Sequence, residues 1–128
     1  MSQSVKALSA NIKGDFASFN QTVIERRNLR PDDVAIDIKY CGICHSDVSM
    51  VQWQGAHFPM VPGHEISGIV SAVGRDVKNF QPGDRVGVGC FVNSCGQCAA
   101  CKAGQEQFCE NGVVVVFDSE DDDLSLIH

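Results

Sequence analysis

The sequence of 128 residues has few aromatic residues, since Trp and Tyr occur once each and Phe seven times. It also has no long apolar run. A membrane-spanning helix needs about 20 consecutive apolar residues, and no segment approaches that length. The opening stretch, MSQSVKALSANIKGDF, also lacks the apolar core of a signal peptide. We therefore expect a cytoplasmic protein, and cysteine thiols stay reduced in that compartment.

Positive charge is also scarce. The sequence has 10 Lys and Arg residues against 16 Asp and Glu residues, which gives a formal net charge of −6. Five of the acids lie between positions 118 and 123, so the remainder of the chain is nearly neutral. Neither part suits a polyanionic partner, and the bases near the N-terminus are dispersed. These features argue against binding to nucleic acid or to a membrane surface.

Short apolar and alternating segments predict mainly β-structure. Residues 34–40, VAIDIKY, alternate apolar and polar side chains, which is typical of a strand with one buried face. Further strands are expected within 63–74, 80–89 and 113–117, the last as a buried apolar run. Twelve glycines stand mostly near turns and strand ends. A chain of short strands that folds back so often favours a small β-barrel.

Two short helices are expected among these strands. Residues 45–53, HSDVSMVQW, predict a helix that Ser46 or Asp47 could cap. A helical turn is expected at 99–104, where Gly104 would end it.

Four of the seven cysteines lie within the segment 94–109, SCGQCAACKAGQEQFC. Zinc prefers four tetrahedral ligands, and C-x2-C pairs supply neighbouring positions from one loop. Four thiolates leave no open position, so such a site is structural and stabilises a loop with little apolar surface. The predicted ligands, in a C-x2-C-x2-C-x7-C pattern, are Cys95, Cys98, Cys101 and Cys109.

Other interpretations of this cluster are weaker. Ferredoxin cysteines follow a C-x2-C-x2-C-x3-C-P pattern, whereas the last gap here is seven residues and Glu110 follows it. An iron–sulfur carrier would also be brown, and a zinc protein is colourless. Disulfides are disfavoured in a reducing compartment, and mere packing does not explain so many thiols in one short loop. Structural zinc is the preferred interpretation.

A second group of candidate ligands lies in CGICHSD, 41–47, and in GHE, 63–65. One thiolate and His64, from neighbouring strand ends, would form part of a zinc site, and Glu65 could add an oxygen ligand. Spacing alone does not decide between Cys41 and Cys44. A lone Cys and His are often only packing residues, and CxxC also occurs in thioredoxins, although no βαβ pattern surrounds it here.

The ordered set CGICHSD, VPGHEISGIVSAVG, QPGDRVGVGC and the cysteine cluster resembles the zinc-dependent medium-chain alcohol dehydrogenase family. It is similar in particular to the cinnamyl-alcohol-dehydrogenase-like branch of NADP-dependent aldehyde reductases. The resemblance runs from about Arg26 to Asp118. It implies a mainly β, GroES-like, partly open barrel with short helices and a zinc-binding loop lobe. It also implies NADP(H)-dependent interconversion of primary alcohols and aldehydes, and a homodimer for a full-length enzyme.

The resemblance also implies roles for particular residues. The catalytic zinc would be held by Cys44 and His64, with Glu65 as a carboxylate that can approach it. Ser46 would relay the alcohol proton, His45 would lie near the cofactor, and Asp47 would orient a ligand. The structural zinc would fall on Cys95, Cys98, Cys101 and Cys109. The remaining implied positions are Trp53 in the substrate pocket or the core, Cys41 as a packing residue and Cys90 as a buried strand residue.

Two features of the family are missing from the sequence. No cysteine follows Cys109 to complete the catalytic zinc site, and no GxGxxG turn is present to bind a dinucleotide. We therefore expect residues 1–128 to be the N-terminal part of the catalytic domain, with a lobe at 90–112 and no nucleotide-binding domain. The isolated chain should bind zinc tightly in the lobe, weakly or not at the catalytic position, and be inactive. A non-enzymatic, zinc-binding GroES-like interaction module is the alternative.

Overall fold

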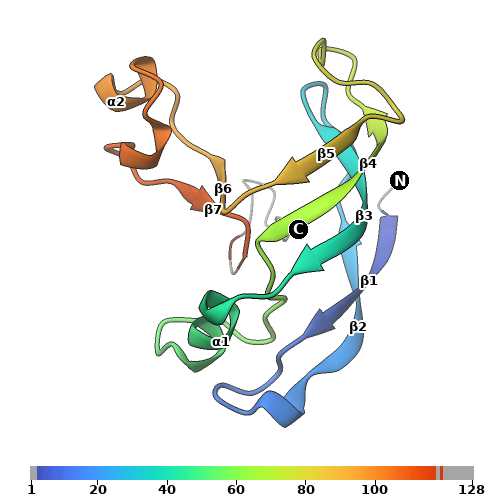
Figure 1. Cartoon of the computed structure of the whole chain (residues 1–128), viewed down its shortest axis with the longest axis vertical. Coiled ribbons are helices and arrows are strands. Elements are labelled where there is room, and N and C mark those ends of the chain that lie inside the picture. The colour runs from blue at the N-terminus through green and yellow to red at the C-terminus, as the bar shows by residue number, and fades with distance from the viewer. Residues whose placement is uncertain (1–2, 118, 120–128) are drawn as a thin grey trace.

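The computed structural model describes residues 3–117 and 119, and these form mainly strands (Figure 1). The strands are β1 (Gln3–Ser9), β2 (Asn20–Arg26), β3 (Val34–Gly42), β4 (Glu65–Val73), β5 (Arg85–Val88), β6 (Phe91–Asn93) and β7 (Val114–Val115). The helices are α1 (His45–Gln52) and α2 (Ala99–Lys102), with 3-10 turns η1 (Phe16–Ser18) and η2 (Glu106–Phe108). The acidic run at 118–123 lies almost entirely outside the described residues.

The strands pair antiparallel in three small sheets, ordered β1-β2, β3-β4-β5 and β6-β7. The described sheets do not close into a barrel, in agreement with the expected partly open, mainly β architecture. Figure 1 shows α2 and its loops projecting to one side, away from β1 to β5. The predicted strands at 63–74 and 80–89 correspond to β4 and β5.

The N-terminal hairpin of β1 and β2 was not predicted from the sequence. Its strands pair over their whole length, from Gln3 opposite Arg26 to Ser9 opposite Asn20. Many side chains remain accessible, and Leu8 and Val23 are 60% and 62% exposed. Strands that bury so little apolar surface carry a weak alternation signal, which explains why pattern analysis missed them.

The predicted alternation of buried and exposed side chains on β3 is wrong in its second half. Ile38 and Tyr40 are 51% and 78% exposed. Within the described residues β3 pairs only with β4, whereas β4 pairs on both edges and buries Ile66 and Val70. The sequence pattern indicated the strand, but neighbouring elements determine which of its side chains are covered.

Helix α1 occupies nearly the predicted range, but its cap differs from the prediction. Cys44 is the N-cap residue, and its thiol accepts from the backbone N–H of Ser46 at 3.4 Å. Asp47 is three residues further on, and its carboxylate accepts from the backbone N–H of Cys44 at 2.9 Å. This reciprocal arrangement is a capping box, so the start of α1 fixes the Cys44 thiol and the Asp47 carboxylate together.

Two other local predictions need correction. The apolar run at 113–117 forms only the two-residue strand β7, because Val116 and Phe117 leave the strand and enter the core. Cys90 lies in a bend between β5 and β6 and is half-buried, so it is not a buried strand residue. The predicted helical turn after Cys98 is present as α2, and Gly104 follows it with a φ of +71°.

Two small apolar clusters hold the sheets and α1 together. Ala10, Val51 and Met60 join the end of the hairpin to α1, and Ala10 and Met60 also exchange backbone hydrogen bonds of 2.8 and 2.9 Å. The second cluster, formed by Ile66, Val116 and Phe117, joins β4 to the segment after β7. Met50 packs against both clusters, and this contact fixes α1 beside the start of β4.

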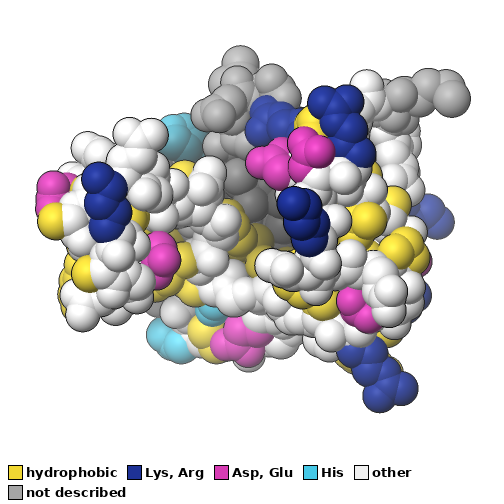
Figure 2. All heavy atoms as spheres, turned by 90° about the horizontal axis from the view of Figure 1, so that it is seen from above, with side chains coloured by type: hydrophobic (Ala, Val, Ile, Leu, Met, Phe, Trp, Pro, Cys, Tyr) yellow, Lys and Arg dark blue, Asp and Glu magenta, His cyan; other side chains and the backbone are white. Residues whose placement is uncertain are grey.

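Charged side chains of both signs are interspersed on the face shown in Figure 2, where Lys and Arg lie among Asp and Glu. No helix in the described part of the chain is long and apolar enough to cross a membrane.

Asp33 connects the end of the hairpin to the start of β3. Its carboxylate pairs with the guanidinium of Arg27 and accepts from the backbone N–H of Arg30 at 2.7 Å. The hydrogen bond from Arg27 is the largest of the influences that lower the pKa of Asp33. We expect Asp33→Asn to lower the free energy of unfolding by about 1 kcal/mol at pH 7, measured by urea denaturation.

This effect should depend on pH. The folded-state pKa of Asp33 lies below its unfolded value, so the stabilisation is present above the unfolded value and disappears as pH falls through the folded one. The difference between wild type and Asp33→Asn should therefore shrink at pH 3. Asp37→Asn is the control, because the Asp37 carboxylate is 63% exposed and lies 3.9 Å from Lys39 Nζ. Equal losses for Asp33→Asn at both pH values would contradict the prediction.

Candidate metal centres

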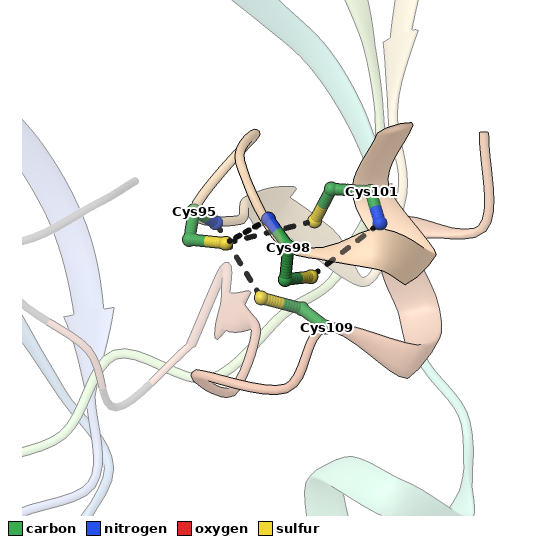
Figure 3. A group of neighbouring side chains, drawn as sticks. All are labelled: Cys95, Cys98, Cys101 and Cys109. Atoms are coloured by element: carbon green, nitrogen blue, oxygen red, sulfur yellow. Dashed lines mark hydrogen bonds between the residues drawn. The ribbon is translucent and has the colours of Figure 1, made fainter. Parts of the chain in front are cut away.

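The four cysteines of the lobe converge on one point (Figure 3). One ligand atom from each lies within 4.8 Å of the others. Helix α2 is capped by Cys98 and carries Cys101, and η2 delivers the fourth cysteine from the other side of the loop. The lobe therefore gathers the predicted set Cys95, Cys98, Cys101 and Cys109.

Distances in the lobe fit a tetrahedral zinc ion. Two thiolates at about 2.3 Å from one zinc ion are separated by roughly 3.8 Å in tetrahedral geometry. The Sγ atoms of Cys95 and Cys101 lie 3.9 Å apart. Backbone N–H groups also point at the sulfurs, with Cys98 N donating to Cys95 Sγ at 3.3 Å and Cys95 N to Cys109 Sγ at 3.5 Å. These donors stabilise negative charge on the thiolates that zinc requires.

The thiols of the lobe differ in acidity. Hydrogen bonds from the backbone of Gln97 and Cys98 lower the pKa of Cys95 to about 6. The backbone of Cys101 likewise lowers the pKa of Cys98. A hydrogen bond with Ser94 lowers the pKa of Cys101, but burial and the neighbouring thiols outweigh it and raise that pKa to about 11. Two thiols therefore favour the metal-binding form, and the buried Cys101 gains most from a nearby cation.

A second candidate centre joins the start of α1 to the start of β4. The Sγ atom of Cys44 lies 3.2 Å from Nε2 of His64, whose residue is 8% exposed. A thiolate and an imidazole on one tetrahedral zinc ion would be separated by roughly 3.5 Å, so a small shift would admit the ion. Cys41 is exposed, and its thiol donates to the Gly42 carbonyl at 3.7 Å. The structure therefore brings Cys44, and not Cys41, to His64. The expectation that Cys41 is a packing residue is wrong, because its side chain is exposed.

Asp47 lies on the opposite side of the imidazole. Its Oδ1 atom is 3.2 Å from Nδ1 of His64, and its Oδ2 atom accepts from the backbone N–H of Cys44. A carboxylate only accepts, so Nδ1 carries the proton and Nε2 presents its lone pair towards Cys44. Ligand atoms of Cys44, Asp47 and His64 fall within 4.8 Å of one another. We nevertheless interpret Asp47 as an orienting residue, because both of its oxygens are occupied and it faces the nitrogen that is away from the thiol.

Glu65 supplies an oxygen on the thiol side of the imidazole. Its Oε1 atom lies 3.8 Å from His64 Nε2, and its side chain is 52% exposed. Zinc ligands of the imidazole and carboxylate types would be separated by roughly 3.4 Å, so a modest rotation of the carboxylate would bring it into range. The available donor set is therefore one sulfur, one nitrogen and one carboxylate oxygen.

An open pocket of about 570 Å³ lies along α1, and its lining includes Phe117, which packs against His64 of this centre. Ser46 and Trp53, both singled out in the sequence, line it, and Trp53 is 56% exposed rather than buried in the core. His45 is exposed at the first residue of α1 but does not line this pocket. The remaining lining residues are Ser49, Met50, Gln52 and Phe117.

Phe117 is a residue of the site that sequence reasoning missed. Its ring centroid lies 4.9 Å from that of His64, with the planes tilted by 56°, and the residue is 7% exposed. The sequence predicts it only as the end of an apolar run. No local pattern links it to His64, which is more than fifty positions earlier.

Comparison with known proteins supports the architecture. The family profile "Alcohol dehydrogenase GroES-like domain" matches residues 30–119. A probable formaldehyde dehydrogenase of Bacillus subtilis is 60% identical over 109 residues, which cover 84% of this chain and 31% of the relative. Cinnamyl alcohol dehydrogenase 7 of Oryza sativa subsp. japonica is 46% identical over 120 residues, which cover 92% of this chain and 32% of the relative.

The fold also matches a solved structure. The CAD of Helicobacter pylori, solved in complex with NADP(H), superposes with a TM-score of 0.88 at 45% identity. The match covers 98% of this chain and 36% of that one. The chain therefore spans about a third of the length of these relatives.

Proposed function

Since the chain belongs to the zinc-dependent alcohol dehydrogenase family through its GroES-like domain, we propose that it provides the metal-binding part of an oxidoreductase. The reaction is the interconversion of alcohols and aldehydes with NADP(H) as hydride carrier. Residues 1–128 would form the N-terminal part of the catalytic domain, with the structural-zinc lobe at 90–112. The observation that carries the proposal is the imidazole of His64, held between the Asp47 carboxylate and the Cys44 thiol.

In this proposal the two metal centres have different tasks. Cys95, Cys98, Cys101 and Cys109 hold a structural zinc, which stabilises the lobe. Cys44 and His64, with Glu65 within reach, hold the catalytic ion beside the pocket. Zinc bound there supplies Lewis acidity, which polarises an aldehyde carbonyl and favours the deprotonated alcohol.

Residues of α1 would transfer the proton and contact the substrate. Bound NADPH would supply the hydride for aldehyde reduction, and Ser46 Oγ would give a proton to the carbonyl oxygen. His45 at the exposed start of α1 would approach the cofactor, and Asp47 would keep Nε2 of His64 directed at the centre. Trp53 would form one wall for the substrate, as its position in the pocket supports. A homodimeric, full-length enzyme remains the expected assembly.

A chimera tests this function. The segment of the Bacillus subtilis dehydrogenase that aligns with this chain is replaced by this chain, and NADPH oxidation is measured with aldehydes. We expect turnover, and Ser46→Ala should reduce kcat by about 100-fold because the proton relay is lost. Cys41→Ser is the control, since its exposed thiol lies outside both centres. A folded chimera that contains both metals but shows no turnover would contradict the proposal.

The alternative, a zinc-binding GroES-like interaction module, predicts a different result. This alternative accounts for the lobe, because a structural zinc site can also stabilise a protein that is not an enzyme. It leaves unexplained the His64 ring, whose two nitrogens face a carboxylate and a thiol, beside an open pocket. A folded chimera that holds zinc in the lobe but shows no turnover would favour this alternative.

A further inference from the structure

Gly42 occupies a position where backbone conformation does not require glycine. It is the last residue of β3 and pairs with Glu65, the first residue of β4. Its φ lies outside the left-handed region. Glycine is unfavourable in a strand, because it loses more backbone entropy on folding and adds no packing. Another property of Gly42 must account for its presence here.

Space is the property that distinguishes Gly42. A Cβ atom at this position would lie 2.4 Å from Oε2 of Glu65 and 3.1 Å from its Cβ. Non-bonded atoms are in favourable contact only near 3.5 Å, so a methyl group and the present Glu65 side chain cannot coexist. Gly68 and Gly74, in contrast, would meet mainly backbone atoms of neighbouring segments, which concerns the packing of the chain itself.

The same Glu65 carboxylate faces the second metal centre with its other oxygen. Oε1 is 3.8 Å from His64 Nε2, and that nitrogen is 3.2 Å from Cys44 Sγ. The side chain of Glu65 is 52% exposed, so no surrounding core fixes its rotamer. The bare Cα of Gly42 leaves room for the rotamer that brings the carboxylate to the ligand atoms.

We propose that Gly42 is a positioning residue for the second metal centre. Because Gly42 has no side chain, the Glu65 carboxylate has room beside it and stays within reach of a divalent ion at Cys44 and His64. This inference rests on the proposed function, because it presupposes an ion at these two residues. It adds that the cross-strand pair of Gly42 and Glu65 sets the position of the carboxylate donor at this centre.

Cobalt(II) titration of the whole chain tests the inference. The thiolate-to-cobalt absorption of the second centre is obtained as the difference between the chain and its Cys44→Ser variant. We expect Gly42→Ala to weaken cobalt binding at this centre about tenfold, as loss of a supporting residue around a metal typically does. Gly89→Ala is the matched control, because a Cβ there meets nothing within 4 Å and its φ is not left-handed.

A double-mutant cycle separates positioning from general damage. In a Glu65→Ala background, Gly42→Ala should cause no further loss of cobalt affinity, because the carboxylate that it displaces is already absent. A tenfold loss in both backgrounds, or unchanged cobalt affinity in Gly42→Ala, would overturn the inference. Absence of cobalt binding at Cys44 in the unsubstituted chain would also overturn the inference, whereas the proposed function is contradicted only by a folded chimera that contains both metals and shows no turnover. Cobalt bound by the four-cysteine lobe reports in every variant that the lobe is folded, and far-UV circular dichroism reports whether the strands are.

Discussion

Replacing Cys98 with serine is expected to release the metal of the lobe and to unfold the lobe locally. The segment 94–112 contains only one turn of helix, one 3-10 turn and a single buried apolar residue, Cys101. It has too little apolar contact to remain ordered by packing alone. Structural zinc in such small motifs contributes on the order of 10 kcal/mol, so the lobe depends on its metal.

Elemental analysis and hydrogen exchange measure this outcome. Cys98→Ser should contain one zinc ion fewer per chain, and the amides of 94–112 should lose protection while those of β3 and β4 keep theirs. Cys41→Ser serves as the control for loss of a thiol, because Cys41 is exposed and lies outside the lobe. Full zinc content with a protected lobe in Cys98→Ser would show that the four thiols are not a metal site.

Replacing His64 with glutamine is expected to abolish the second metal centre while the lobe stays loaded. Glutamine fills much of the space next to Phe117. Its amide nitrogen has no lone pair to replace that of His64 Nε2 facing Cys44, and it has no ring that Asp47 could orient. The described residues then offer a thiolate and a carboxylate at the centre. We expect the cobalt affinity there to fall by at least about 100-fold.

Cobalt absorption and zinc content distinguish the two centres. The unsubstituted chain should hold its lobe ion through dialysis and lose the second ion more readily, because the second centre has fewer thiolates. His64→Gln should retain only the lobe ion. His57→Ala is the control, because His57 is exposed and is not in either group of candidate ligands. Two tightly held ions in His64→Gln would show that the second ion sits elsewhere.

Much of the lobe could be predicted from the sequence, because its information is local. The four thiols lie within fifteen residues, and C-x2-C spacing constrains neighbouring ligands irrespective of the rest of the fold. The helix at 45–53 and the strands within 63–74 and 80–89 were also found, since their patterns extend over several residues. The family resemblance then predicted the GroES-like fold, and the match over residues 30–119 confirms it.

The second centre was predictable only in part, because it depends on contacts between distant segments. Sequence spacing left Cys41 and Cys44 equivalent. The end of β3 and the capping box of α1 place Cys44 beside His64 and leave Cys41 exposed. Phe117 reaches the imidazole because the chain leaves β7 and enters the core, and no local pattern predicts such a contact.

The sequence by itself determined the donor types, the spacing within each motif and the mainly β character, because these depend on residue chemistry and short-range geometry. Only the tertiary structure decided which nitrogen of His64 faces Asp47 and which faces Cys44. Only the cross-strand register placed Gly42 against Glu65. These features arise from strand pairing and core packing, in which segments far apart in the chain fix one another's positions, and such long-range contacts leave no periodic signal in a single sequence.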